Sequence, residues 1–115
     1  MDKKHLMRLR GKVAIVTGSS RGIGVGIAKR LASEGARVVI NGRHPEAVEE
    51  VALELRASGA EVLTVSGDVG YRENVDRLFD ETVRAFGGVN ILVNNVGWTT
   101  PKLHFLETNE ELWDN

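Results

Sequence analysis

A glycine-rich turn carries the strongest chemical signal in this sequence. Gly18, Gly22 and Gly24 lie between a β-branched run at residues 13–16 and a helical pattern that begins near residue 22. Glycines let a ligand approach the backbone closely, and the start of a helix offers unpaired N–H groups and the positive end of the helix dipole. A strand-to-helix turn of this kind suits a diphosphate. The segment therefore predicts a site for a nucleotide cofactor.

The elements that must position this turn alternate along the chain. Short apolar runs predict strands at Val13–Thr17, Arg37–Asn41, Glu61–Ser66 and Asn90–Asn94. Helical spacing predicts helices at Gly22–Glu34, Pro45–Ser58 and Tyr71–Phe86. Apolar strands that alternate with amphipathic helices indicate a parallel sheet covered on both faces. Right-handed crossovers then give a doubly wound α/β sheet of the Rossmann type.

The apolar residues of each predicted helix share one face, which we expect to pack on the sheet. These residues are Ile23, Ile27 and Leu31 in the first helix, Val48, Val51 and Leu55 in the second, and Val75, Leu78, Phe79, Val83 and Phe86 in the third. A glycine follows each helix, at Gly35, Gly59 and Gly87. We expect these glycines in the left-handed conformation that ends many helices.

Length and composition fit one small domain over residues 1–115, with 42% apolar residues and a net charge of −1. Near-neutral charge gives no support for nucleic acid as a partner. The absence of cysteine excludes disulfides and thiolate metal sites, and the three histidines share no metal-ligand spacing. Apolar runs are far shorter than the roughly 20 residues that span a bilayer. The basic amino terminus lacks the apolar core of a secretory signal, so we expect no membrane segment and a cytoplasmic location.

Three motifs occur in an order that resembles the short-chain dehydrogenase/reductase family. They are the Thr-Gly-x-x-x-Gly-x-Gly spacing at residues 17–24, Asp68-Val69 after the third strand, and Asn94-Asn95-Val96-Gly97 after the fourth. The resemblance runs from about Leu9 to Asn115 and corresponds to the first half or less of a usual member. It implies an incomplete domain, truncated after the fourth strand. It also implies an NAD(P)-dependent oxidoreductase that acts on a carbonyl/alcohol pair.

The resemblance implies cofactor contacts for residues at the ends of the strands. These are Gly18, Ser19, Ser20, Arg21, Gly22, Ile23 and Gly24 in the first turn, Asp68 and Val69 at the adenine, and Asn95, Val96 and Gly97 at the ribose. Asp68 has a second interpretation, as the N-cap of the third helix. Val96 stands where the family usually has alanine, so it restricts the approach of the ribose.

The choice between NADP(H) and NAD(H) depends on the end of the second strand. NAD sites usually place an acid there to bind the ribose 2′-OH, and Gly42 occupies the family's acidic position. Arg43 follows it. Together with Arg21 it is suited to a 2′-phosphate through charge-assisted hydrogen bonds, although surface arginines are often only solvated. We therefore expect NADP(H) rather than NAD(H).

The family's catalytic residues have no counterpart in this sequence. The resemblance places an asparagine, a serine and a tyrosine followed four residues later by lysine beyond residue 115. The one tyrosine is Tyr71, and Val75 lies four residues after it, so no catalytic residue is assigned. The alternative function is a non-catalytic nucleotide-binding module or a truncated, inactive product. A family isomerase or epimerase is less compatible with the glycine spacing. In an intact protein we expect a small carbonyl or alcohol substrate and an arrangement as a homo-oligomer.

Overall fold

Four parallel strands form one sheet in the order β3-β2-β1-β4. The computed structural model of the chain describes residues 8–95. In this range the elements are β1 (Val13–Val16), α2 (Gly22–Ser33), β2 (Arg37–Gly42), α3 (Pro45–Ala57), β3 (Val62–Ser66), α4 (Arg72–Phe86) and β4 (Ile91–Val93). The chain builds outward from β1 to β3 and then returns to place β4 on the other side of β1. This order confirms the predicted doubly wound α/β sheet.

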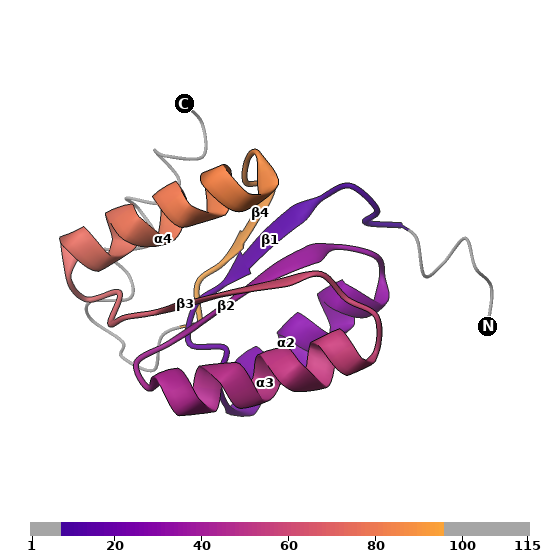
Figure 1. Cartoon of the computed structure of the whole chain (residues 1–115), viewed down its shortest axis with the longest axis horizontal. Coiled ribbons are helices and arrows are strands. Elements are labelled where there is room, and N and C mark those ends of the chain that lie inside the picture. Colours follow the sequence, from indigo (N-terminus) through magenta and orange to yellow (C-terminus); the bar gives the residue numbers. More distant parts are fainter. Residues whose placement is uncertain (1–7, 96–115) are drawn as a thin grey trace.

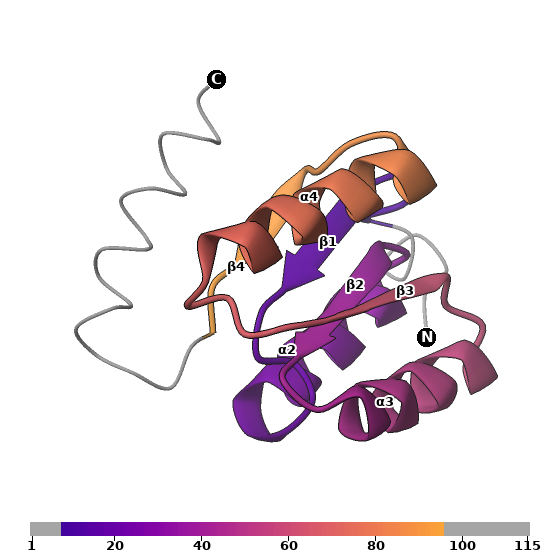
Figure 2. The same cartoon turned by 60° about the vertical axis from the view of Figure 1, so that its left-hand side comes forward.

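Helices cover both faces of the sheet, with α2 and α3 on one face and α4 on the other (Figure 1, Figure 2). Two separate cores result. Ala14 and Val16 of β1 pack in the core under α2 and α3, whereas Ile15 packs in the core under α4. Alternate side chains of a strand point to opposite faces, so every residue of β1 is buried. The apolar run at residues 13–16 therefore reflects a central strand that is covered on both sides.

The helix faces agree with the expected pattern in α3 and depart from it at single residues in the other two helices, Ile23 and Val83. Val48, Val51 and Leu55 are buried, as predicted. In α2, Ile27 and Leu31 pack against the core as predicted, whereas Ile23 is 75% exposed and the buried residues are Gly24 and Ala28. The spacing of the larger side chains did not predict the burial of Gly24 and Ala28. These two residues are small, so α2 can lie close to the turn after β1.

In α4 the buried residues are Leu78 and Thr82, whereas Val83, predicted to face the sheet, is 50% exposed. Thr82 tolerates burial because its hydroxyl donates a hydrogen bond to the carbonyl oxygen of Leu78 at 2.7 Å. The partly buried Phe79 and Phe86 pack around the same core. The helix therefore turns a threonine, which sequence periodicity counts as polar, toward the sheet.

The predicted boundaries hold to within one residue at each end. β2 includes Gly42, which pairs with Ser66 of β3. α4 begins after Tyr71, whose backbone is extended. The glycines that follow the helices, Gly35, Gly59 and Gly87, have φ values of 97°, 100° and 87°, which confirms the expected left-handed conformation. The sequence also predicts a capping box formed by Thr108 and Glu111 at the start of a further helix, and these residues lie outside the described range.

Candidate functional site

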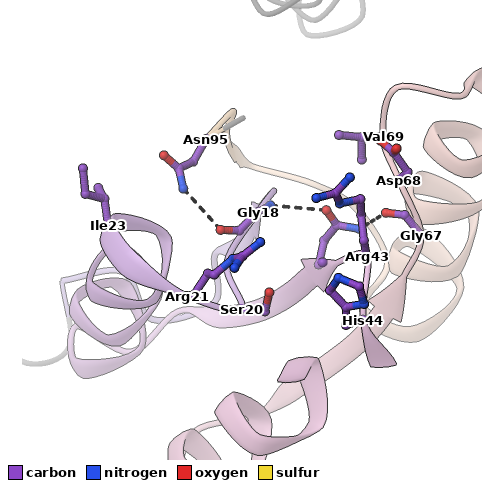
Figure 3. A pocket seen from close by; sticks show the side chains of 12 residues that line it. Gly18, Ser20, Arg21, Ile23, Arg43, His44, Gly67, Asp68, Val69 and Asn95 are labelled. Atoms are coloured by element: carbon purple, nitrogen blue, oxygen red, sulfur yellow. Dashed lines mark hydrogen bonds between the residues drawn. The ribbon is translucent and has the colours of Figure 1, made fainter. Parts of the chain in front are cut away.

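A cleft of about 400 Å³ lies where the four strands end at their carboxyl edge. Its walls come from the turn after each strand (Figure 3). The lining residues are Gly18, Ser20, Arg21 and Ile23 after β1, Asn41, Gly42, Arg43 and His44 at the end of β2, Gly67, Asp68 and Val69 after β3, and Asn95 after β4. Open α/β sheets bind ligands at this edge, beside the point where the strand order reverses. The position is therefore that of a ligand site.

The turn after β1 forms a backbone cradle that has no room for a side chain at Gly18 or at Gly24. Gly18 has a φ of 59°, and a Cβ on it would lie 2.2 Å from the carbonyl oxygen of Asn95. A Cβ on Gly24 would lie 2.3 Å from the carbonyl oxygen of Gly18. Both obstacles are backbone atoms, which cannot rotate away. The first turn of α2 can therefore lie directly behind Gly18 only because both residues are glycines.

Hydrogen bonds join this turn to the end of β4. The Asn95 backbone N–H donates to Thr17 Oγ1 at 2.9 Å, and Asn95 Nδ2 donates to the carbonyl oxygen of Gly18 at 3.2 Å. Thr17 Oγ1 in turn donates to Asn94 Oδ1 at 3.2 Å. The turn after β1 and the end of β4 are thus held together by Thr17, Asn94 and the lining residue Asn95.

Asn41 connects three of the cleft's walls, and sequence reasoning did not identify it. Its side chain is buried, with 3% of the residue exposed. Asn41 Oδ1 accepts a hydrogen bond from the Gly18 N–H at 3.3 Å, while Nδ2 donates to the carbonyl oxygens of Val65 at 3.0 Å and Gly67 at 3.1 Å. A buried amide needs such partners. One feature of the sequence could have identified Asn41: it is an amide residue at the end of a strand that is otherwise rich in valine and isoleucine.

Ser19, expected at the cofactor, lies behind the cleft. It is fully buried. Its hydroxyl donates to the Val16 carbonyl oxygen at 2.6 Å and accepts from the Asn41 N–H at 2.9 Å. Its own N–H donates to the Asn41 carbonyl oxygen at 2.7 Å. These bonds occupy both the hydroxyl and the N–H of Ser19. Ser19 therefore holds the turn after β1 against the end of β2.

The cationic side of the cleft lies between the first turn and the start of α3. The exposed side chains of Arg21 and Arg43 come from opposite walls and extend toward the same open space (Figure 3). His44 follows Arg43 in the sequence and lines the cleft with it, a position that the sequence did not predict. Three basic side chains therefore surround this part of the cleft, and Gly42 contributes no carboxylate there.

The turn after β3 contributes an acidic residue, Asp68, and an apolar residue, Val69, to the cleft. Asp68 Oδ1 accepts a hydrogen bond from the Gly70 N–H at 2.8 Å. The N-cap of α4 is Tyr71, and no side chain caps that helix. The alternative role of Asp68 as the helix N-cap is therefore wrong. Val69 lines the cleft beside Asp68 and packs against the core under α4.

Not every residue expected at the cofactor lines the cleft. Gly22 has a φ of 61° and an open surrounding, and Gly24 is buried behind Gly18. Val96 and Gly97 lie outside the described residues. Within residues 8–95 there is no group of acidic, histidine or cysteine side chains that could hold a metal ion. The same residues include no helix with the length and apolarity needed to cross a membrane.

Known proteins resemble this chain in sequence and in fold. The profile of the short chain dehydrogenase family matches residues 12–115. Dehydrogenase/reductase SDR family member 4 of Caenorhabditis elegans is 42% identical over 108 residues, which are 93% of this chain and 42% of that protein. NADP-dependent (R)-specific alcohol dehydrogenase of Lentilactobacillus kefiri is 44% identical over 105 residues, or 90% of this chain and 41% of that protein. The chain thus spans about two fifths of the length of these relatives.

Solved structures agree with the sequence relatives. L-Sorbose reductase from Gluconobacter frateurii, complexed with NADPH and L-sorbose, superimposes with a TM-score of 0.78 at 43% identity, covering 83% of this chain and 36% of the reductase. A metagenomic short-chain oxidoreductase in complex with NADP gives a TM-score of 0.74 at 40% identity, covering 78% of this chain and 41% of that structure. The family profile, the sequence identity and the shared fold agree, and this chain belongs to the short chain dehydrogenase family.

Proposed function

We propose that this chain is the cofactor-binding part of a short-chain oxidoreductase that uses NADP(H) to interconvert a carbonyl and an alcohol. The observation that carries the proposal is the cleft itself. One wall is the turn after β1, where Gly18 and Gly24 have no room for a Cβ. Arg21 from that wall and Arg43 from the end of β2 face the same space, and residue 42 contributes no acid. A backbone cradle suits a diphosphate, and paired arginines suit a further phosphate.

The proposed contacts follow the order of the walls. Gly18, Ser20, Gly22 and Ile23 would hold the diphosphate, Arg21 and Arg43 would hold the 2′-phosphate, and Gly24 would keep the start of α2 close to the turn. Asp68 would accept a hydrogen bond from the adenine amino group beside Val69, and Asn95, Val96 and Gly97 would lie along the ribose. Ser19 would act indirectly, by fixing the turn. When bound, NADPH would give a hydride to the carbonyl and NADP⁺ would accept one from the alcohol, while the residues of the cleft would set the position of the cofactor.

The preference for NADP(H) rests on charge. A hydrogen bond to a charged group contributes about 1.5–3 kcal/mol, and the exposure of Arg21 and Arg43 places them at the lower end of that range. A tenfold preference needs about 1.4 kcal/mol. Two relatives point the same way, since the reductase of G. frateurii is complexed with NADPH and the alcohol dehydrogenase of L. kefiri is NADP-dependent. Their names also support the carbonyl/alcohol chemistry.

Arg43→Ala tests this assignment. We expect NADPH binding to weaken about tenfold and NADH binding to stay the same, because only NADPH carries the 2′-phosphate. Fluorescence titration of the chain with each cofactor measures both affinities. Arg84→Ala is the matched control, since Arg84 is an exposed arginine near the end of α4 and lines no part of the cleft. Equal losses for both cofactors would mean that Arg43 acts on their shared diphosphate, and the assignment of NADP(H) would be wrong.

We further propose that the 115-residue chain binds the cofactor without turning over substrate. The sequence offers no tyrosine followed by lysine at a spacing of four, since Val75 follows Tyr71 at that distance. Tyr71 is 59% exposed and does not line the cleft. We expect no change in absorbance at the nicotinamide band when the chain is mixed with NADPH and a panel of ketones. Turnover that persists after host reductases are removed would contradict this and would exclude the alternative of a purely binding module.

Three expectations from the sequence stay predictions. They are the single, incomplete domain over residues 1–115, the cytoplasmic location, and assembly into a homo-oligomer in an intact protein. Limited proteolysis tests the extent of the domain, and fractionation of cells tests the location. Light scattering on the longest natural form of the protein tests the oligomeric state.

A further inference from the structure

The backbone conformation of Gly42 does not require a glycine. It ends β2, is buried, and pairs with Ser66 of β3. Its φ is outside the positive region that favours glycine, which in this chain includes residues such as Gly18 and Gly22. Any residue type could adopt this backbone. The explanation must therefore lie in the space around its α-carbon.

That space is filled from two directions. A Cβ on Gly42 would lie 2.5 Å from Ser20 Oγ and 3.0 Å from Ser20 Cβ. On the other side it would lie 3.0 Å from Val48 Cγ2. Contacts below about 3.4 Å are shorter than the optimal separation of carbon atoms. A side chain at residue 42 therefore competes with the side chain of Ser20.

The neighbouring atoms have little freedom to move apart. Val48 is 1% exposed and belongs to the core under α2 and α3. The backbone of Gly42 is held by a hydrogen bond from the Gly67 N–H to its carbonyl oxygen at 2.9 Å. Ser20 follows Ser19, whose N–H and hydroxyl are both bonded to the backbone of Asn41. Rotation of the Ser20 hydroxyl would relieve the shortest contact but not the one to its Cβ.

We propose that Ser20 and Gly42 act as a coupled pair that determines cofactor choice: Ser20 excludes a side chain from residue 42 and thereby keeps a carboxylate away from the ribose 2′ position. This inference rests on the proposed function, since it concerns the same cleft. It adds Ser20 to Arg21 and Arg43 as a residue that determines cofactor specificity. It also means that an acid at residue 42 can serve the 2′-OH of NADH only when Ser20 is replaced by glycine.

The packing part of the inference is tested without any cofactor. The variants are Gly42→Ala, Ser20→Gly and the two together, each followed by thermal unfolding of the 115-residue chain. We expect Gly42→Ala to lower Tm by about 5 °C and Ser20→Gly to restore at least half of that loss. Ser33→Gly, an exposed serine of α2, is the matched control and should combine additively with Gly42→Ala. Additive behaviour of Ser20→Gly as well would overturn the pairing.

The specificity part is tested by titration with NADH and NADPH. Gly42→Asp alone should weaken NADPH binding about tenfold or more without improving NADH binding. Gly42→Asp with Ser20→Gly should bind NADH about tenfold more tightly than the parent chain does. Tight NADH binding by Gly42→Asp alone would overturn the inference. A parent chain that binds neither cofactor would contradict the proposed function, while the thermal measurements would still decide whether the two residues are coupled.

Discussion

Gly24→Ala is expected to abolish measurable NADPH binding and to lower Tm by about 10 °C, since an added methyl in a filled space costs about 1–3 kcal/mol or more. The new Cβ would lie 2.3 Å from the Gly18 carbonyl oxygen and 2.9 Å from Ser19 Cα. These are backbone atoms of the turn that forms the cradle. The start of α2 must therefore move away from the turn, and the cradle opens. Isothermal titration with NADPH and thermal unfolding measure the two effects.

Gly26→Ala is the control for this change, because Gly26 lies two residues later in the same helix. Gly26 is exposed, and a Cβ there would meet no atom within 4 Å. Alanine stabilises an exposed helix position by about 0.5–1 kcal/mol relative to glycine, so we expect a higher Tm and unchanged NADPH binding. If both variants behaved alike, close packing at Gly24 would not be the cause.

Leu78→Ala is expected to lower the free energy of unfolding by about 2–5 kcal/mol. Leu78 is 1% exposed and is the buried apolar side chain through which α4 reaches the core formed with Ile15 and Val39. Its loss leaves a cavity under α4, between the sheet and the partly buried Phe79 and Phe86. Small domains are stable by only about 5–15 kcal/mol, so this single change removes a large share. Urea denaturation followed by circular dichroism gives the value.

Val83→Ala provides the comparison within α4. Val83 is 50% exposed, and we expect its truncation to change the free energy of unfolding by less than about 0.5 kcal/mol. The sequence pattern treats Leu78 and Val83 as members of one apolar face, so the two variants also distinguish the observed face from the predicted one. Similar losses for both would favour the predicted face and contradict the observed one.

The fold was predictable because its determinants are local. The β-branched runs, the helical periodicity and the glycines that end the helices each lie within a few residues, and the boundaries they predict agree with the structure to one residue. The errors concern single residues of two helix faces. Ile23 and Val83 were expected in the core because they are large and apolar. Gly24 and Thr82 are buried instead, since close approach and a hydrogen bond to the preceding turn outweigh size.

The part of the candidate site that is formed by backbone, the glycine turn, could be predicted from the sequence. The parts in which side chains connect distant strands were harder to predict. The glycine turn follows from spacing alone. The role of Asn41 depends on hydrogen bonds to residues 23, 24 and 26 positions away along the chain, and these require the register of three strands. The sequestration of Ser19 depends on the same register. Motif matching therefore names the residues of the turn without distinguishing those that face the ligand from those that hold the turn in place.

The hydrogen bond from Thr17 to Asn94 joins residues that are 77 positions apart, and this separation affects how a newly made chain matures. A ribosome releases the glycine turn well before the segment that completes the cleft. Closing so long a loop costs entropy, and pairing between distant parallel strands slows folding. A dinucleotide that also contacts Asn95 stabilises only molecules in which β4 has joined the sheet, by mass action. The cellular supply of cofactor would then act as a selection step for fully assembled molecules over half-formed ones.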